Sequence, residues 1–217
     1  MRPRLLIFDF DGTLGDTRQN IIFTFRATME RLGLEMRSEE VCASTIGLTL
    51  LDGFKAMYAD MDDAMAQRAV DTYREIFEEN YYSLIPPLFP NVATTLERLH
   101  NAGYRMSIAS SRATQSLNIF LREMGIAHYF EYVVGSDSVT CHKPQPEPVN
   151  ITLDALDVLY TDALVIGDMP VDVLMAHNAV VKVCAVTYGN ATREELERIY
   201  PTYIIDDFAE LLNILEV

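Results

Sequence analysis

Apolar residues along this chain follow two patterns: short continuous runs, and stripes spaced about three or four residues apart. Continuous runs are typical of strands buried in a parallel sheet, whereas stripes are typical of amphipathic helices. The first run, Leu5–Phe8, stands alone near the start of the chain, and the next begins roughly 90 residues later. In chain order, the runs predict strands near residues 5–8, 104–109, 132–135, 163–166, 181–186 and 203–205.

The long segment between the first two predicted strands contains helical stripes and no strand pattern. One stripe lies between Thr17 and Gly33, residues suited to begin and to end a helix. A second stripe runs from Val70 to Tyr81. The proline-rich stretch at residues 84–90 then stops helix formation and predicts a linker. An all-helical block therefore interrupts the sheet after its first strand.

Beyond the prolines, predicted helices alternate with the remaining strands. Residues 91–102 and 114–124 predict helices, and each is followed by a glycine that ends it. Such alternation predicts an α/β fold in which a parallel sheet carries helices on both faces.

The composition is that of a globular protein with an excess of acid. Of the 217 residues, 49% are hydrophobic and 23% are charged, and the formal net charge is −15. This charge argues against nucleic acid or an anionic membrane surface as a partner. No apolar stretch approaches the roughly 20 residues that span a bilayer, and the run before Asp9 is too short for a signal peptide. The three cysteines form no CxxC pair and fit reduced thiols, so we expect a cytoplasmic protein.

Chemically active side chains follow three of the predicted strands, and a lysine lies in a proline-stiffened loop before the third of these strands. Ligands of open α/β sheets bind beyond the carboxyl ends of the strands, where these side chains fall. Aspartate, glycine and serine are also ordinary turn residues, so no single segment identifies a site. In chain order the candidates are Asp9, Asp11, Ser110, Ser111, Lys143, Asp168 and Asp172.

Four motifs surround these candidates in a fixed order. They are Asp-x-Asp-Gly-Thr from Asp9, a serine at the end of a strand, Lys-Pro from Lys143, and Gly-Asp-x-x-x-Asp ending at Asp172. Each motif is a weak or moderate signal alone. Together, in this order, they resemble the haloacid-dehalogenase-like superfamily, whose members are mostly phosphatases. The resemblance covers the whole chain.

The resemblance also implies a layout for the two kinds of segment. In the superfamily, a Rossmann-like, doubly wound parallel sheet carries an all-helical cap domain inserted just after the first motif. Here the core corresponds to residues 1–15 and 86–217, and the cap to residues 16–85. That the helical block closes over the site is implied by the resemblance alone.

The superfamily's chemistry assigns roles to the candidates. Phosphoryl transfer passes through an aspartyl-phosphate, with the residues matching Asp9 and Asp11 as nucleophile and general acid/base. Ser110 offers a hydroxyl, and Ser111 and Arg112 offer backbone amides, to the phosphate oxygens. Lys143 is placed to shield the nucleophile from the phosphate charge and to stabilise the transition state.

The four aspartates predict a metal site. Crowded carboxylates raise one another's pKa unless a cation intervenes, and hard oxygen ligands with a phosphate substrate select Mg²⁺. We assign Asp9 and Asp168 as ligands, with the Asp11 backbone carbonyl as a third by resemblance. Asp172 lies one helical turn after Asp168 and is either a ligand or a support for one. Helix N-terminal capping is the alternative for both of these residues.

The side chains of two basic residues near the motifs have no assigned role. Arg112 follows the serines and reaches either the substrate or solvent. His142 is interpreted as a loop residue, because Asp11 already fills the acid/base role.

The aspartate at position 11 argues against two branches of the superfamily, the dehalogenases and the P-type ATPases. Dehalogenases of this fold lack that acid and need no metal, and P-type ATPases carry threonine there and are far longer. A phosphatase acting on a small phosphorylated metabolite is the leading interpretation, with a phosphomutase as the alternative and the oligomeric state open. A catalytically silent binding module would be expected to lose Asp9, Asp11 or Lys143, and all three are present.

One segment of the helical block bears on the substrate. Residues 44–50 resemble the Ile-Gly-Leu-Pro-Leu segment of phosphoglycolate-phosphatase-like members, with Thr49 where proline is usual. Gly47 and Leu48 are its candidate specificity residues. β-Phosphoglucomutase relatives carry basic residues around this loop, whereas here the loop is neutral and Lys55 is the nearest candidate. Pyrophosphatase relatives share the pattern and remain an alternative, as does a purely structural helix-end glycine with core leucines.

Overall fold

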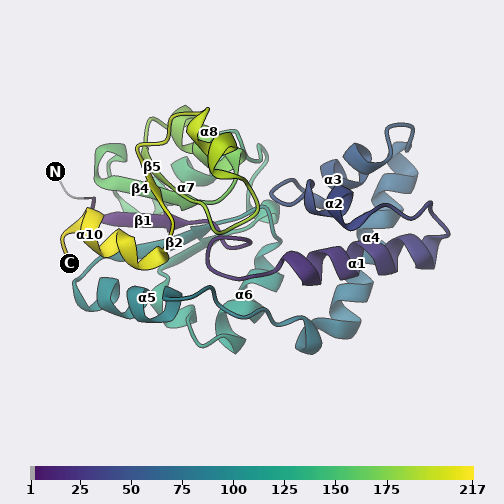
Figure 1. Cartoon of the computed structure of the whole chain (residues 1–217), viewed down its shortest axis with the longest axis horizontal. Helices are drawn as coiled ribbons and strands as arrows, with labels where there is room; N and C mark the ends of the chain where they lie inside the picture. Colours follow the sequence, from purple (N-terminus) through teal and green to yellow (C-terminus); the bar gives the residue numbers. More distant parts are fainter. Residues whose placement is uncertain (1–2) are drawn as a thin grey trace.

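Six parallel strands form one sheet in the part of the chain that the computed structural model describes, residues 3–217 (Figure 1). They lie in the order β3-β2-β1-β4-β5-β6, and every neighbouring pair is parallel. β1 occupies the centre of the sheet, and its four residues are fully buried. The strands are β1 (Leu5–Phe8), β2 (Arg105–Ala109), β3 (Tyr132–Val134), β4 (Ala163–Gly167), β5 (Lys182–Val186) and β6 (Tyr203–Ile205).

Helices cover both faces of the sheet, which explains the continuous apolar run in β1. Its side chains alternate between the faces, so Leu6 and Phe8 join one core cluster while Leu5 and Ile7 join the other. One face is covered by α5 (Val92–Asn101), α6 (Thr114–Glu123) and α10 (Leu211–Leu215), and the other by α7 (Glu147–Leu156), α8 (Pro170–Asn178) and α9 (Arg193–Glu197). Short 3-10 helices are η1 (Tyr81–Leu84), η2 (Ala127–Tyr129), η3 (Ser136–Ser138), η4 (Tyr160–Asp162) and η5 (Phe208–Glu210).

The segment between β1 and α5 forms a helical unit beyond the carboxyl ends of the strands (Figure 1). It packs around an aromatic cluster of its own, distinct from the two clusters that flank the sheet. The Phe25 ring centre lies 5.1 Å from that of Phe54 and 5.0 Å from that of Tyr73. The helices of the unit are α1 (Arg18–Leu32), α2 (Glu39–Ala43), α3 (Leu50–Met57) and α4 (Asp63–Asn80).

The strands predicted from apolar runs are all present, so the α/β fold class is confirmed. The helices predicted at 91–102 and 114–124 are α5 and α6. The stripe predicted to end at Tyr81 extends one residue beyond α4, which ends at Asn80, because Tyr81 begins a 3-10 helix. Gly33 ends α1 with a φ of 64°, whereas the Thr17 hydroxyl is buried and makes no capping hydrogen bond. No helix within the described residues combines the length and apolar character needed to cross a membrane.

Candidate active site

The carboxyl ends of three neighbouring strands bring the predicted residues together. β1 pairs in register with both β2 and β4, so the three strands end side by side. Asp9 follows β1, and its backbone N–H donates to the Ile166 carbonyl at 2.8 Å. Ser110 follows β2 and Asp168 follows β4 in the same way. The convergence expected from the strand ends is therefore present.

Three carboxylates, from Asp9, Asp168 and Asp172, form a buried acidic cluster. One oxygen of each lies within 4.8 Å of those of the other two. Asp172 reaches the cluster from the first turn of α8, where it also accepts a hydrogen bond from the Met169 backbone N–H at 3.0 Å. Capping and membership of the cluster, posed as alternatives for this residue, both occur.

Lys143 lies among these carboxylates. Its Nζ donates to Asp9 Oδ1 and to Asp172 Oδ1, each at 2.6 Å, and its side chain is 2% exposed. The lysine comes from the loop before α7, so the ion pairs join three separate segments of the chain. Removing one partner of such a buried pair leaves an uncompensated charge, which is strongly unfavourable.

One lysine does not balance three buried carboxylates. Burial raises the pKa of Asp9 well above its ordinary value; Lys143 opposes this shift, while Asp172 and Asp168 add to it. Burial, together with Asp172, raises the pKa of Asp168 to about 7. Burial lowers the pKa of Lys143, but Asp172 and Asp9 outweigh it and the net shift is upward. The charge balance of the cluster accommodates a further cation.

Asp168 is held by neighbours that the sequence analysis did not identify. Thr13 Oγ1 donates to its Oδ1 at 3.1 Å. Asn190 donates to its Oδ2 from the backbone N–H at 2.7 Å and from the side-chain amide at 3.0 Å. The Tyr188 hydroxyl donates to the Thr13 carbonyl at 2.9 Å. Tyr188 and Asn190 follow β5, the strand beside β4, so the convergence of strand ends is a signal that could have found them.

Gly12 makes the approach of this turn to Asp168 possible. Its φ is +88°, and a Cβ at this position would lie 2.2 Å from Asp168 Oδ2 and from Asn190 Nδ2. The chain folds back here, with three successive backbone N–H groups donating to the Phe10 carbonyl.

The Asp11 carboxylate pairs with an arginine and is not part of the acidic cluster. Arg112 Nε donates to both carboxylate oxygens at 3.1 Å, and Nη2 donates to Oδ1 at 2.7 Å. The two side chains are 10% and 13% exposed, so Arg112 does not point into solvent, and it lines the cavity together with Asp11. Burial lowers the pKa of Arg112, but Asp11 outweighs it and the net shift is upward.

The two serines after β2 have different partners. Ser110 is buried, and its Oγ accepts a hydrogen bond from the Arg112 backbone N–H at 3.2 Å. Ser111 Oγ donates to the carbonyl of Gly47 at 2.7 Å. Gly47 belongs to the helical unit, so this bond joins the strand end to the loop singled out for specificity.

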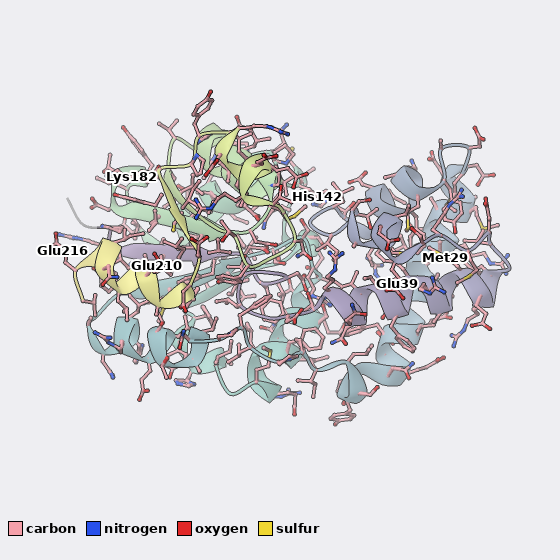
Figure 2. The ribbon with its side chains drawn as sticks, viewed as in Figure 1. Met29, Glu39, His142, Lys182, Glu210 and Glu216 are labelled. Atoms are coloured by element: carbon pink, nitrogen blue, oxygen red, sulfur yellow. The ribbon has the colours of Figure 1, made fainter. Side chains whose placement is uncertain are left out.

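A cavity of about 620 Å³ lies between the sheet and the helical unit. Asp9 and Asp11 line it from the core, and Gly47 and Leu48 line it from the helical unit. His142 also lines the cavity and lies at the edge of the core that faces the helical unit (Figure 2). Ser110 and Ser111 line the cavity as well. Within residues 3–217, the cavity lining does not include Lys143, Asp168 or Asp172.

Comparison with known proteins gives the family. Residues 6–186 match the model of the haloacid dehalogenase-like hydrolases. "Probable phosphatase IndB" of Dickeya dadantii is 33% identical, with 98% of this chain and 93% of that protein aligned. "Pyrophosphatase PpaX" of Oceanobacillus iheyensis is 30% identical, with 99% of this chain and 98% of that protein aligned.

Solved structures share the fold over the full length. A haloacid dehalogenase-like hydrolase of Bacteroides fragilis superposes with a TM-score of 0.91 at 31% identity, covering 97% of this chain and 100% of that one. A predicted phosphoglycolate phosphatase of Haemophilus somnus superposes with a TM-score of 0.90 at 25% identity, covering 99% of this chain and 98% of that one. The chain is therefore an enzyme of the haloacid dehalogenase-like hydrolase family, related to its phosphatases.

Proposed function

We propose that this protein is a Mg²⁺-dependent phosphatase that hydrolyses a small phosphorylated metabolite through an aspartyl-phosphate on Asp9. The position of Asp9 carries the proposal. Of the three carboxylates in the acidic cluster, that of Asp9 also lines the cavity. A carboxylate oriented by a buried lysine and facing an open space is suited to attack a phosphorus atom bound there.

The two half-reactions use Asp9 and Asp11 in turn. In the first, Asp9 attacks phosphorus, the bond to the leaving oxygen breaks, and Asp11 gives that oxygen a proton. In the second, water attacks the phosphorus of the aspartyl-phosphate, Asp11 takes the proton, and Asp9 leaves. Both side chains line one cavity, as both steps require. Lys143 and the Ser110 hydroxyl are placed to offset phosphoryl charge.

The donor set fits Mg²⁺. Asp9, Asp168 and Asp172 offer carboxylate oxygens, which this ion prefers, and the single lysine among them leaves negative charge for the ion to balance. Asp9 and Asp168, with the Asp11 backbone carbonyl, would hold the ion, and Asp172 would bind it or orient Lys143. When bound, Mg²⁺ neutralises charge on the transferred phosphoryl group.

The cavity favours a monophosphate ester with a largely apolar leaving group. A second phosphate, as in pyrophosphate or a sugar bisphosphate, needs positive charge. Of the residues within 3–217 that line the cavity, those from the helical unit include one positively charged side chain, Arg74, and two negatively charged ones, Asp52 and Glu78. We therefore place the pyrophosphatase and phosphomutase alternatives below the phosphatase. The apolar part of the lining includes Leu48, Val70, Phe77 and Ile119.

We also propose that residues 16–85 act as a cap domain over a core of residues 1–15 and 86–217. The separate aromatic cluster of the helical unit supports this division. The hydrogen bond from Ser111 to Gly47 is a contact between the two parts beside the cavity. The cysteines are free, which supports the cytoplasm as the site of action.

Phosphate release from 4-nitrophenyl phosphate tests the proposal. Wild type and Asp9→Asn are each assayed with Mg²⁺ and with a chelator, and we expect turnover only from wild type with Mg²⁺. Asp60→Asn, an exposed aspartate of the helical unit, is the matched control and should behave as wild type. Equal activity in folded Asp9→Asn would overturn the nucleophile assignment. Inactivity of the wild type towards this ester and a panel of metabolite phosphates would overturn the phosphatase.

A further inference from the structure

Arg112 and Asp11 form a fixed pair at the wall of the cavity. Two nitrogens of the guanidinium make three hydrogen bonds to the carboxylate, one at 2.7 Å and two at 3.1 Å. Such contacts restrict both the distance and the plane of a carboxylate. Both residues line the cavity, so the pair borders the space that a substrate would occupy.

Arg112 is itself held from several sides. Its guanidinium carbon lies 4.9 Å from the centre of the Phe120 ring, on α6, and 5.8 Å from that of Phe77, on α4. Its backbone N–H is bonded to Ser110 Oγ at 3.2 Å. Stacking on two rings and a short tether to the end of β2 leave the guanidinium little freedom. Because α6 belongs to the core and α4 to the helical unit, Arg112 contacts both parts of the molecule.

Asp11 depends on this arginine for its orientation. Within residues 3–217, the side-chain hydrogen bonds to the Asp11 carboxylate all come from Arg112. Asp11 is not one of the clustered carboxylates, and Lys143 bonds to Asp9 and Asp172, so neither the cluster nor Lys143 holds it. Without Arg112, the side chain of Asp11 would be free to rotate at the edge of the cavity.

We propose that Arg112 is a positioning residue, which holds the Asp11 carboxylate where it exchanges protons with the leaving group and with water. The inference rests on the proposed function, because it takes Asp11 as the general acid/base. In the first half-reaction, the proton passes from Asp11 to the leaving oxygen as the phosphorus–oxygen bond breaks, and Arg112 pairs with the carboxylate that remains. In the second, water returns a proton to Asp11 as its oxygen bonds to phosphorus and Asp9 departs.

Two other roles for a buried arginine in this place give different kinetics. An arginine that binds the substrate weakens the binding of every ester when it is removed. An arginine that only fills space lowers stability without regard to the leaving group. Positioning of the acid makes the loss depend on the leaving group, because a good leaving group departs without a proton.

The test is kcat/KM for a series of phosphate monoesters whose leaving groups run from nitrophenol to an aliphatic alcohol. This parameter reports the steps up to formation of the aspartyl-phosphate, and so the first proton transfer. Arg112→Met keeps an apolar side chain against the two rings. We expect it to lower kcat/KM by about 100-fold for the aliphatic ester and by less than about threefold for the nitrophenyl ester. Asp11→Asn should show the same dependence.

Two further variants make the result specific. Arg112→Lys keeps the charge but not the paired contact, and we expect an intermediate dependence on the leaving group. Arg31→Met removes an arginine that makes a similar two-nitrogen contact with Glu79 on the surface of the helical unit, at 3.1 Å and 2.6 Å. It should leave kcat/KM unchanged for every ester.

The outcomes separate this inference from the proposed function. An equal loss for all esters in Arg112→Met, or no loss, overturns the positioning role and leaves the phosphatase intact. Activity in folded Asp9→Asn overturns the proposed function instead. If circular dichroism shows that Arg112→Met does not fold, Arg112→Lys is judged by the same criterion, and a uniform effect across the series overturns the inference.

Discussion

Lys143 Nζ lies 2.6 Å from a carboxylate oxygen of Asp9 and 2.6 Å from one of Asp172. All three side chains are less than 10% exposed. The lysine therefore links the end of β1 to the first turn of α8, and it is the positive charge closest to the proposed nucleophile. Its removal should affect both the chemistry and the stability of the site.

Lys143→Met should lower kcat/KM by about 100- to 1,000-fold, because it removes the charge that stabilises the phosphoryl oxygens. It also leaves Asp9 and Asp172 unpaired, which should cost about 3–5 kcal/mol of the free energy of unfolding. Steady-state kinetics and urea unfolding measure the two effects. Lys182→Met is the control, since Lys182 is exposed at the far end of the sheet (Figure 2). A Lys143→Met enzyme within about threefold of wild type would contradict the assignment.

Gly12→Ala should destabilise the protein by about 2–4 kcal/mol and lower activity by about 100-fold, because the added methyl group displaces Asp168 and Asn190. Gly33→Ala is the matched control. Gly33 also has a positive φ, +64°, but apart from its own neighbours in the chain no atom of residues 3–217 lies within 4 Å of the position of a Cβ. Gly33→Ala should lower the free energy of unfolding by only about 1 kcal/mol, through backbone strain. Equal costs in thermal unfolding would show that the crowding at Gly12 has no effect.

In the metal-free protein, the raised pKa of Asp168 predicts that stability falls as pH rises. Its pKa is about 7 when folded, against an ordinary value of 3.8, so between these values the folded state keeps a proton that the unfolded chain has released. The stabilisation is complete below the ordinary value and is lost as the pH rises through about 7. The change over the whole range should be on the order of 4 kcal/mol, and about 3 kcal/mol of it falls above pH 5.

Urea unfolding in chelator at about pH 5 and about pH 8 measures this effect. Asp168→Asn should reduce the difference between the two pH values, because its side chain does not titrate, while Asp9, whose pKa is also raised, keeps part of it. Adding Mg²⁺ at the higher pH should raise the stability of the wild type, since an ion that binds only the folded state shifts the equilibrium towards it. An identical pH dependence of stability in wild type and Asp168→Asn would show that Asp168 is not the group that titrates.

The fold was predictable to the extent that burial shows directly in the chain. A strand covered on both faces is apolar at every position, as Leu5–Phe8 is, and so it stands out from the helical stripes. The convergence of strand ends then brings Asp9, Ser110 and Asp168 together without further information. Asn190 obeys the same rule, but an asparagine in a loop has too many ordinary uses to be singled out.

The pairing of Arg112 with Asp11 was not predictable in the same way. The two residues lie 101 positions apart, and their contact depends on the direction of two side chains. That direction is determined by the turn at Gly12 and by rings from α4 and α6, which no local pattern records. The contact between Ser111 and Gly47 was equally hidden, because its acceptor is a backbone carbonyl.

Rapid acid quenching during turnover with Mg²⁺, followed by mass spectrometry of the peptides, tests most directly whether Asp9 carries the phosphoryl group. We predict one phosphoryl group on the peptide that contains Asp9, its loss on treatment with hydroxylamine, and its absence in Asp9→Asn. Phosphate release by an enzyme that never carries this group, or a phosphoryl group found on another residue, would contradict the proposed mechanism.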